Sequence, residues 1–459
     1  MSSSPLIGGA GLDAPLAWRD GQPLTRRQYL ADVQALAARL PVEGPMLNAS
    51  ADRYGFAVGL GAAMLRSQSN LMPPNHTPDT VARLRGLFPG TYGLTDAVDP
   101  GLALPLVHQG SELASAHASD AVPQLPDDAL AAQVLTSGST GAPVPHAKAW
   151  GLLARNTEAG AKRLAQHMGR PTLAGVTLVA TVPPQHMYGF ESTVLIALLS
   201  GAAFDAERPF YPADIARALE RAPRPRMLVT TPFHLKTLLD SGIELPAIDL
   251  TVCATAPLSP QLAARAEAAL AAPLMEIYGC TEAGQVASRR PTAGIEWHTY
   301  DGLRLSGDGD QTIVQGGHVP QPTPLADVIE VMDATTFRLL GRSNDLINIA
   351  GKRSSLGHLN YHLNMIPGVQ DGAFWLPGDD AGGAVVRLIA FVVAPGLTPQ
   401  AMHALNDSVM KALRERVDAA FLPRRVVQVE ALPREAGTGK QPAGPFAARA
   451  ERALAAARG

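Results

Sequence analysis

The 459-residue sequence is poor in cysteine and aromatic residues and has no excess of either charge, and these scarcities exclude several classes of protein. Its two cysteines, Cys253 and Cys280, are too few for a disulfide framework or a zinc site, which indicates a reducing cytoplasm. The net charge of −3 provides no basic surface for a nucleic-acid partner. No apolar run reaches the roughly 18 residues of a membrane span. The N-terminus has no basic start followed by an apolar core, so we expect no secretory signal.

The chain does have the length for two or three domains and an alternation of strand and helix patterns. Four runs of apolar and β-branched residues are predicted strands, and they cover residues 176–182, 226–231, 250–256 and 274–279. Each run precedes a predicted helix. The last of these predicted helices is the segment TEAGQVASR, residues 281–289. This rhythm predicts an α/β fold with a mostly parallel sheet that is covered by helices on both faces.

The pattern changes twice toward the C-terminus. Beyond Trp297 the segments are short, alternating and interrupted by Gly and Asp, which predicts a small antiparallel sheet or barrel. Residues 345–459 combine strand patterns with an amphipathic helix, as in a compact α+β unit. We therefore expect a large domain over residues 1–343, with parallel sheets and a β-barrel-like subdomain, and a small α+β domain over residues 344–459.

The stretch VLTSGSTG, residues 134–141, has the composition of a phosphate-binding loop. A predicted strand over residues 133–135 leads into hydroxyl-bearing residues and glycines. Glycine lacks the Cβ atom that would keep phosphate oxygens away from backbone N–H groups. No Lys-Ser or Lys-Thr follows at the spacing of a Walker loop. Taken alone, the stretch fits an ordinary Ser/Gly turn equally well.

A second stretch, YGCTE at residues 278–282, lies at the end of a predicted parallel strand, where α/β sheets bind ligands. The ring of Tyr278 can stack on a base. The hydroxyl of Thr281 and the carboxylate of Glu282 can hold a phosphate and its Mg²⁺, because Mg²⁺ takes oxygen ligands and shares them with phosphate. The alternative is a strand-to-helix turn in which Thr281 caps the helix.

Two later stretches place basic residues next to glycine. GRSND at residues 341–345 is typical of a hinge, with Arg342 directed at a phosphate or a ribose. GTGK at residues 437–440 places Lys440 in a Gly-rich loop that can reach the site of another domain. A solvated turn and a disordered basic tail are the structural alternatives.

In this order, the four stretches resemble the motifs of the adenylate-forming superfamily of acyl-CoA synthetases, luciferases and nonribosomal adenylation domains. The resemblance covers essentially the whole chain. It implies that ATP and Mg²⁺ serve to adenylate a carboxylic acid with release of pyrophosphate, and that the acyl group then passes to a phosphopantetheine thiol. It also implies that the C-terminal domain is mobile and rotates about residues near Asn344 between the two half-reactions.

The resemblance assigns a role to each matching residue. The ATP phosphates would be cradled by Thr136, Ser137, Gly138, Ser139, Thr140 and Gly141. The adenine would be bound by Ala254, Thr255, Ala256, Tyr278 and Gly279, with the ring stacked on Tyr278. The ribose hydroxyls would be bound by Asp327, which the matching Arg342 follows in the sequence. The α-phosphate would be contacted by Thr281, and Mg²⁺ would be held by Glu282 and Thr140. His186 would lie beside the acyl pocket, and Lys440 would serve adenylation.

The chain departs from the superfamily pattern in four places. Val144 stands where a lysine is usual; Lys148 further on takes its role, or the role is absent. Asn344 replaces the usual hinge acid, and residues 354–360 lack the usual glutamate. The part before residue 134 is short for the superfamily.

Two segments, STGAPVPHAK and PPQHMYGFE, resemble stand-alone ligases of bacterial aryl polyene and xanthomonadin-type pigment pathways. The resemblance implies that a hydroxybenzoate or similar aryl acid is charged onto an acyl carrier protein in trans. Three alternatives remain open: free CoA as the acceptor, an amino acid whose ammonium group binds Glu191, and a non-catalytic nucleotide-binding relative.

Overall fold

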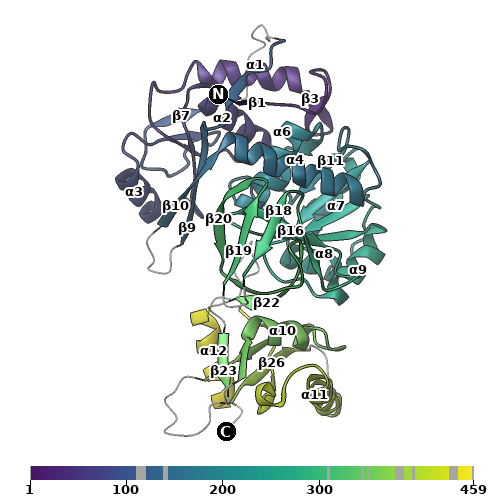
Figure 1. The fold of residues 1–459 in the computed structure, drawn as a ribbon. Helices are drawn as coiled ribbons and strands as arrows, with labels where there is room; N and C mark the ends of the chain where they lie inside the picture. Colours follow the sequence, from purple (N-terminus) through teal and green to yellow (C-terminus); the bar gives the residue numbers. More distant parts are fainter. Residues whose placement is uncertain are drawn as a thin grey trace.

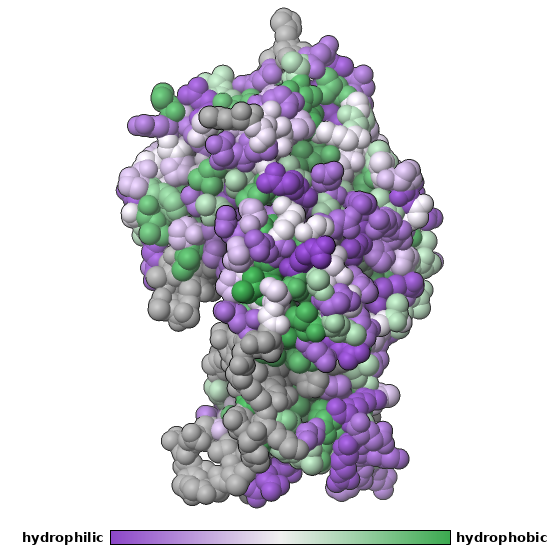
Figure 2. All heavy atoms as spheres, viewed as in Figure 1, coloured by the Kyte–Doolittle hydropathy of each residue, from purple (hydrophilic) through white to green (hydrophobic). Residues whose placement is uncertain are grey.

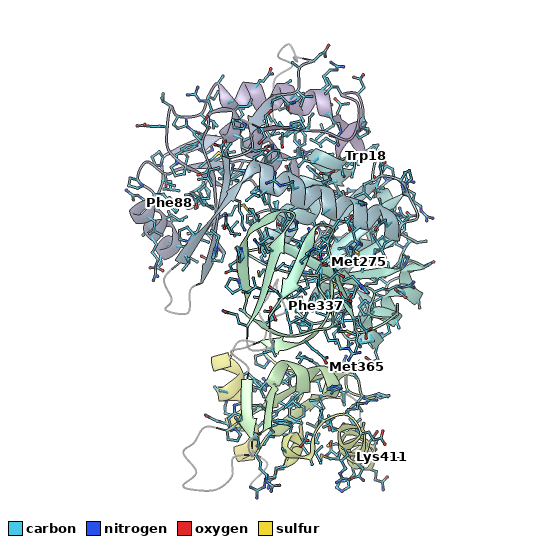
Figure 3. All side chains as sticks on the ribbon, viewed as in Figure 1. Trp18, Phe88, Met275, Phe337, Met365 and Lys411 are labelled. Carbon is cyan, nitrogen blue, oxygen red and sulfur yellow. The ribbon has the colours of Figure 1, made fainter. Side chains whose placement is uncertain are left out.

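The computed structural model describes residues 2–109, 120–137, 143–307, 311–342, 346–349, 352–377, 387–394, 398–433 and 443–456. Figure 1 shows a large body that contains the N-terminus and a smaller body built from the C-terminal residues. Gln261 Nε2 in the large body donates to the carbonyl oxygen of Met365 in the small one at 2.6 Å; Met365 is labelled in Figure 3 where the bodies meet. The proposed boundary at residues 343/344 stays a prediction, because residues 343–345 lie outside the described part.

The largest sheet has eleven strands in the order β21-β22-β17-β16-β15-β14-β13-β11-β12-β2-β3. The run from β2 to β15 is parallel, which confirms the predicted α/β architecture. The strands are β2 (Pro15–Arg19), β3 (Gln22–Thr25), β11 (Thr177–Ala180), β12 (Ala203–Asp205), β13 (Arg226–Thr230), β14 (Leu250–Cys253), β15 (Leu274–Cys280), β16 (Gly284–Arg289), β17 (Trp297–Thr299), β21 (Asp327–Val331) and β22 (Thr336–Arg342).

Helices cover both faces of this sheet, as alternate strand residues show. Val179 and Leu228 pack with α7 (Pro212–Arg221), α8 (Pro232–Asp240) and α9 (Pro260–Leu270). Leu178 and Met227 face the opposite core, which includes α4 (Trp150–His167), α5 (Met187–Gly189), the π-helical turn η1 (Phe190–Leu195) and α6 (Ile196–Ser200). Successive strand residues point to opposite faces, so an apolar strand of this kind needs a cover on each side.

A second, six-stranded sheet has the order β10-β9-β5-β4-β6-β7. Its strands are β4 (Met46–Asn48), β5 (Asn70–Met72), β6 (Tyr92–Thr95), β7 (Leu106–His108), β9 (Leu130–Ser137) and β10 (Pro143–Ala149). The accompanying helices are α1 (Arg26–Ala37), α2 (Arg53–Leu65) and α3 (Pro78–Leu87), while β1 (Ser3–Pro5) pairs with β8 (Gln124–Pro126). Strand β9 confirms the predicted strand before the TSGSTG stretch.

Two segments that the sequence predicts as helix are strands. The stretch AKAWGLLARNTEAGAKRLAQHMG, residues 147–169, predicts one long helix, but residues 147–149 belong to β10 and α4 begins only at Trp150. Pro143 and Pro145 disfavour helix, and β10 is an edge strand, where proline is tolerated. The segment TEAGQVASR forms a turn and β16, because Gly284 adopts a φ of +76° after the turn and β16 pairs antiparallel with β15. The interpretation of Thr281 as a helix cap is therefore wrong.

The small antiparallel sheet predicted beyond Trp297 is confirmed as an open meander of β18 (Leu303–Ser306), β19 (Thr312–Gly316) and β20 (Val319–Leu325). The C-terminal body contains β25 (Asp371–Trp375), β26 (Ile389–Val393) and β27 (Arg425–Gln428), with α10 (Leu356–Asn364) and α11 (Pro399–Arg414) packed in one core and α12 (Ala443–Ala456) in another. Its remaining elements are β23 (Leu346–Ile349), β24 (Lys352–Ser355) and the 3₁₀ turn η3 (Ala419–Phe421).

Apolar residues are scattered among polar ones on the face shown in Figure 2. Within the described residues, no helix is both long enough and apolar enough to cross a membrane.

Candidate active site

The predicted phosphate loop connects the two strands of a β-hairpin. Strand β9 ends at Ser137 and β10 begins at Pro143, and these residues are register partners, as are Thr136 and Val144. Gly138, Ser139, Thr140 and Gly141 lie outside the described residues, as do the side chains of Thr136 and Ser137. Val144, at the position where the superfamily has lysine, exposes 46% of its surface and carries no charge.

Thr281 and Glu282 lie in the turn between β15 and β16. No side chain fits at Gly279, because a Cβ atom there would run into the carbonyl oxygen of Gly284. The Glu282 side chain is 49% exposed, and its Oε1 lies 3.8 Å from Nε2 of His146 on β10. The turn therefore presents a carboxylate to solvent beside the β9–β10 hairpin, which also flanks the predicted phosphate loop.

Three residues that are far apart in the sequence meet at the end of β15. The hydroxyl of Tyr278 donates to Oδ2 of Asp327 at 2.7 Å. Asp327 begins β21 and is the register partner of Arg342, the last residue of β22, whose side chain is not described. The Tyr278 ring is 7% exposed and packs edge-on against Trp297 and Phe337, with centroid separations of 5.8 and 5.7 Å; Phe337 is labelled in Figure 3. The predicted base-stacking and ribose-binding residues thus form one cluster.

The segment containing Ala254, Thr255 and Ala256 follows β14 and is tied to β15. Thr255 has a φ of +85°, a backbone conformation that costs a β-branched residue about 1–3 kcal/mol and concentrates at functional sites. The backbone N–H of Leu258 donates to Oε1 of Glu276 at 3.0 Å, and Arg289 Nε donates to Oε2 of the same carboxylate at 2.7 Å. Glu276 lies two residues before Tyr278, so one buried ion pair holds both parts of the predicted adenine site.

His186 lies beyond the carboxyl end of β11, separated from β15 by β13 and β14. It is half-buried and caps α5, since its Nδ1 accepts from the backbone N–H of Tyr188 at 3.3 Å. The hydroxyl of Tyr188 lies between the carbonyl oxygens of Thr230 and Val252, at 3.1 and 3.0 Å. His186 is thus fixed at the same edge of the sheet as Tyr278, in a different strand position.

Lys148 reaches the turn from β10. Its Nζ donates to the carbonyl oxygen of Thr281 and, at 3.3 Å, to that of Glu282. Burial lowers the pKa of Lys148, while the neighbouring acids Glu191 and Glu282 oppose that shift. The sequence indicated Lys148 only as a candidate replacement for a missing basic residue.

Glu191 belongs to the same group, and sequence reasoning missed its setting. It is 4% exposed in η1, where its Oε1 accepts a hydrogen bond from Nδ2 of Asn156 in α4. Burial raises its pKa to about 7, and the charge of Lys148 and the bond from Asn156 oppose the rise. A lone charged residue in the run GFESTVLIALL was the signal, because a buried charge needs a partner.

The parallel sheet with helices on both faces is an α/β fold, a class that binds ligands at the carboxyl ends of its strands. A family model described as "AMP-binding enzyme" matches residues 77–342, more than half of the chain, and the chain belongs to that family. This confirms the resemblance to the adenylate-forming superfamily at the level of the family.

The chain is also similar in sequence to two named ligases. The chain is 32% identical to a 4-coumarate–CoA ligase of Rhodobacter capsulatus over 56% of its length and 62% of the relative. It is 29% identical to a 4-coumarate–CoA ligase of Halorhodospira halophila over 66% of its length and 72% of the relative.

In structure the chain resembles ATP-bound MatB from Rhodopseudomonas palustris, with a TM-score of 0.74, 18% identity and coverage of 92% and 93% of the two chains. It also resembles the o-succinylbenzoate CoA synthetase MenE from Bacillus subtilis in complex with AMP, with a TM-score of 0.73, 16% identity and coverage of 96% and 97%. These likenesses show the shared fold.

Proposed function

We propose that the chain is an AMP-forming acid–thiol ligase that activates a carboxylic acid with ATP and transfers the acyl group to a thiol. The observation that carries the proposal is the cluster of Tyr278 with Asp327, whose strand partner is Arg342, next to the turn of Thr281 and Glu282. In a ligase of this class, the adenosine half of ATP would be held by Tyr278, Asp327 and Arg342. The turn and the β9–β10 hairpin would then face the phosphates.

In the first half-reaction, a substrate carboxylate oxygen attacks the α-phosphorus and the bond to pyrophosphate breaks. Negative charge grows on the phosphate oxygens, so groups that donate toward them accelerate the step. We assign this task to the hydroxyl of Thr281, the backbone N–H groups of residues 136–141, and the ammonium of Lys440. Lys440 lies outside the described residues, and its role rests on the sequence.

Glu282 and Thr140 would hold Mg²⁺. The half-exposed carboxylate of Glu282 fits this task, because Mg²⁺ takes oxygen ligands and keeps part of its shell for water and phosphate. When bound with ATP, the ion supplies positive charge to the phosphate oxygens. His146, 3.8 Å from the same carboxylate, limits the directions that the Glu282 side chain can take.

For the acid, we propose a hydroxybenzoate-like aryl acid in a pocket beside His186. The two relatives named 4-coumarate–CoA ligase favour an aryl acid. For the acceptor, the segments STGAPVPHAK and PPQHMYGFE favour the phosphopantetheine thiol of an acyl carrier protein in trans, as in pigment biosynthesis. The names of the relatives favour free CoA as the second candidate. We place the reaction in the cytoplasm; both cysteines, Cys253 and Cys280, are free thiols.

A pyrophosphate-exchange screen over benzoates, cinnamates and fatty acids tests the adenylation step. We expect exchange with at least one aryl acid, and exchange with none would refute the ligase proposal. Supplying CoA or a holo carrier protein to the loaded enzyme then identifies the acceptor. The Lys440→Ala variant separates the half-reactions, because it should lose adenylation while it still transfers the acyl group from a preformed adenylate; adenylation at the wild-type rate would disprove the role of Lys440.

The proposed rotation of the C-terminal domain has a test of its own. We propose that residues 344–459 rotate between the half-reactions so that a thiol replaces pyrophosphate at the adenylate. A cross-link that joins the bodies at Gln261 and Met365, which are in contact in this structure, should block one half-reaction and leave the other. If both half-reactions continue at the wild-type rate in the cross-linked protein, rotation is not required.

A further inference from the structure

Strand β10 presents one face to the turn of residues 281–282. Alternate residues of a strand share a face, so Val144, His146 and Lys148 lie on the same side of β10. His146 approaches the carboxylate of Glu282, and Lys148 donates to the two carbonyl oxygens of the turn. The face that lacks a lysine at position 144 therefore carries one four residues further along, in contact with the turn.

The strand is also irregular at this point. The pairing of β10 with β9 shifts register between Lys148 and Ala149, so that Lys148 lies opposite Ala132 and Ala149 opposite Leu130. Such bulges bend a strand and change the direction of a side chain, and they are frequent next to active sites. The register shift thus lies directly at the residue that makes the contact.

Glu191 lies against the same turn from the interior. Gly284 closes the turn, and a Cβ atom there would lie 2.8 Å from Oε1 of Glu191 and 3.0 Å from Nδ2 of Asn156. The carboxylate therefore approaches the backbone as closely as glycine allows. The ammonium of Lys148 and the carboxylate of Glu191 act on the two ends of a four-residue turn, residues 281–284. Glu191 is also the acid that most opposes the lowering of the pKa of Lys148 by burial.

We propose that Lys148, with Glu191 packed against the other end of the turn, is the positioning residue that fixes the Thr281–Glu282 turn against the β9–β10 hairpin. Since a trans peptide is planar, holding the carbonyl oxygens of Thr281 and Glu282 fixes the peptide planes on both sides of Glu282 and thereby the direction of its Cα–Cβ bond, from which the carboxylate extends. This inference rests on the proposed function, in which that carboxylate holds Mg²⁺. Lys148 acts through the turn and touches no substrate phosphate.

The test compares Lys148→Met, Lys148→Arg and Glu191→Gln in the full-length chain. Lys162→Met is the matched control, because Lys162 on neighbouring α4 forms an exposed ion pair with Asp301. Hydrogen bonds from a charged group are worth about 1.5–3 kcal/mol, so Lys148→Met should lower kcat/KM for MgATP about 10- to 100-fold. It should also raise the Mg²⁺ concentration for half-maximal exchange and leave the KM for the acid unchanged. Lys148→Arg should recover part of the loss.

A structural role alone predicts a different outcome. In that case, Lys148→Met would reduce the amount of folded enzyme and lower kcat at unchanged KM values and unchanged Mg²⁺ dependence, which would overturn the proposal. If Lys148→Met does not fold, Lys148→Arg and Glu191→Gln decide, because both keep a side chain of similar size. If Lys148→Arg and Glu191→Gln both show the Mg²⁺ dependence of wild type, the proposal is again overturned.

Failure of this inference is distinguishable from failure of the ligase proposal. If the wild-type protein exchanges pyrophosphate with no acid, calorimetric titration with MgATP still compares wild type with Lys148→Met. About tenfold weaker binding in the variant would support the positioning role, and equal or absent binding in both would overturn it. Exchange that is present in wild type and unaffected in folded Lys148→Met would overturn the positioning role alone.

Discussion

Replacing Glu191 by glutamine removes a buried titrating group, and we expect the stability of the protein to depend on pH differently as a result. The Glu191 carboxyl is 4% exposed, and burial raises its pKa from 4.5 to about 7. The folded protein therefore holds a proton on Glu191 more tightly than the unfolded chain does. The resulting stabilisation is fully present below pH 4.5 and is lost as the pH rises through 7.

The size of this loss follows from the shift in pKa. One pH unit corresponds to about 1.4 kcal/mol, so the difference between 4.5 and about 7 amounts to about 3 kcal/mol in the free energy of unfolding. Glutamine does not titrate, so the Glu191→Gln variant does not lose this free energy of unfolding as the pH rises. The variant therefore gains stability relative to wild type as the pH rises.

Thermal unfolding of wild type and Glu191→Gln between pH 4.5 and pH 8 measures the effect. Unfolding a chain of 459 residues has an entropy of about 1 kcal/mol/K, so the difference between the two melting temperatures should move by about 3 °C toward the variant. Glu191→Asp keeps a titrating carboxyl and is the control, which should follow wild type. A melting-temperature difference that stays constant across this pH range would refute the reasoning.

Three further substitutions test the packing around the nucleotide site. Arg289→Met leaves the buried carboxylate of Glu276 without its charged partner and should lower the free energy of unfolding by about 3–5 kcal/mol. Adding Glu276→Gln in a double variant should restore part of that stability. Equal stability of the single and the double variant in urea would argue against the ion pair. Tyr278→Phe removes the hydrogen bond to Asp327 and should weaken AMP binding about tenfold in calorimetry and lower the melting temperature by about 2 °C. Thr255→Gly relieves the strain of the φ of +85° and should raise the free energy of unfolding by about 1 kcal/mol. A free energy of unfolding below that of wild type would show that the conformation is not strained.

The central part of the fold was predictable from the hydrophobic pattern alone. Strands β11, β13, β14 and β15 occur where the sequence shows short apolar and β-branched runs, and β13 and β14 each precede a helix with one buried face. A parallel strand buried on both faces needs such runs, so local composition and tertiary environment agree there. The strand β10 and the strand β16 were missed, because Ala, Lys, Glu and Gln favour helix locally while pairing with a neighbouring strand decides the outcome.

The candidate site was predictable only through the resemblance of its motifs. Asp327 lies 49 residues beyond Tyr278, and no periodicity relates them, yet their side chains form a hydrogen bond. The contact of Lys148 with the carbonyl oxygen of Thr281 spans 133 residues. Such contacts depend on how separate sheets pack, which a local pattern does not encode. Glu191 was visible in the sequence only as a candidate ligand for the ammonium group of an amino acid, and its neighbours Asn156 and Lys148 were not predictable.

The turn between β15 and β16 is where three separately built parts of the molecule meet. Lys148 brings the edge of the six-stranded sheet to it, and Glu191 brings the helical core against Gly284. Three residues before the turn, Tyr278 joins β15 to β21 through Asp327. A rotation of either sheet relative to the other must therefore break the hydrogen bonds from the Lys148 ammonium to the carbonyl oxygens of the turn. The geometry of the proposed Mg²⁺ carboxylate thus depends on the packing of both sheets, so substitutions in either sheet should change the Mg²⁺ dependence of adenylation before they change binding of the acid.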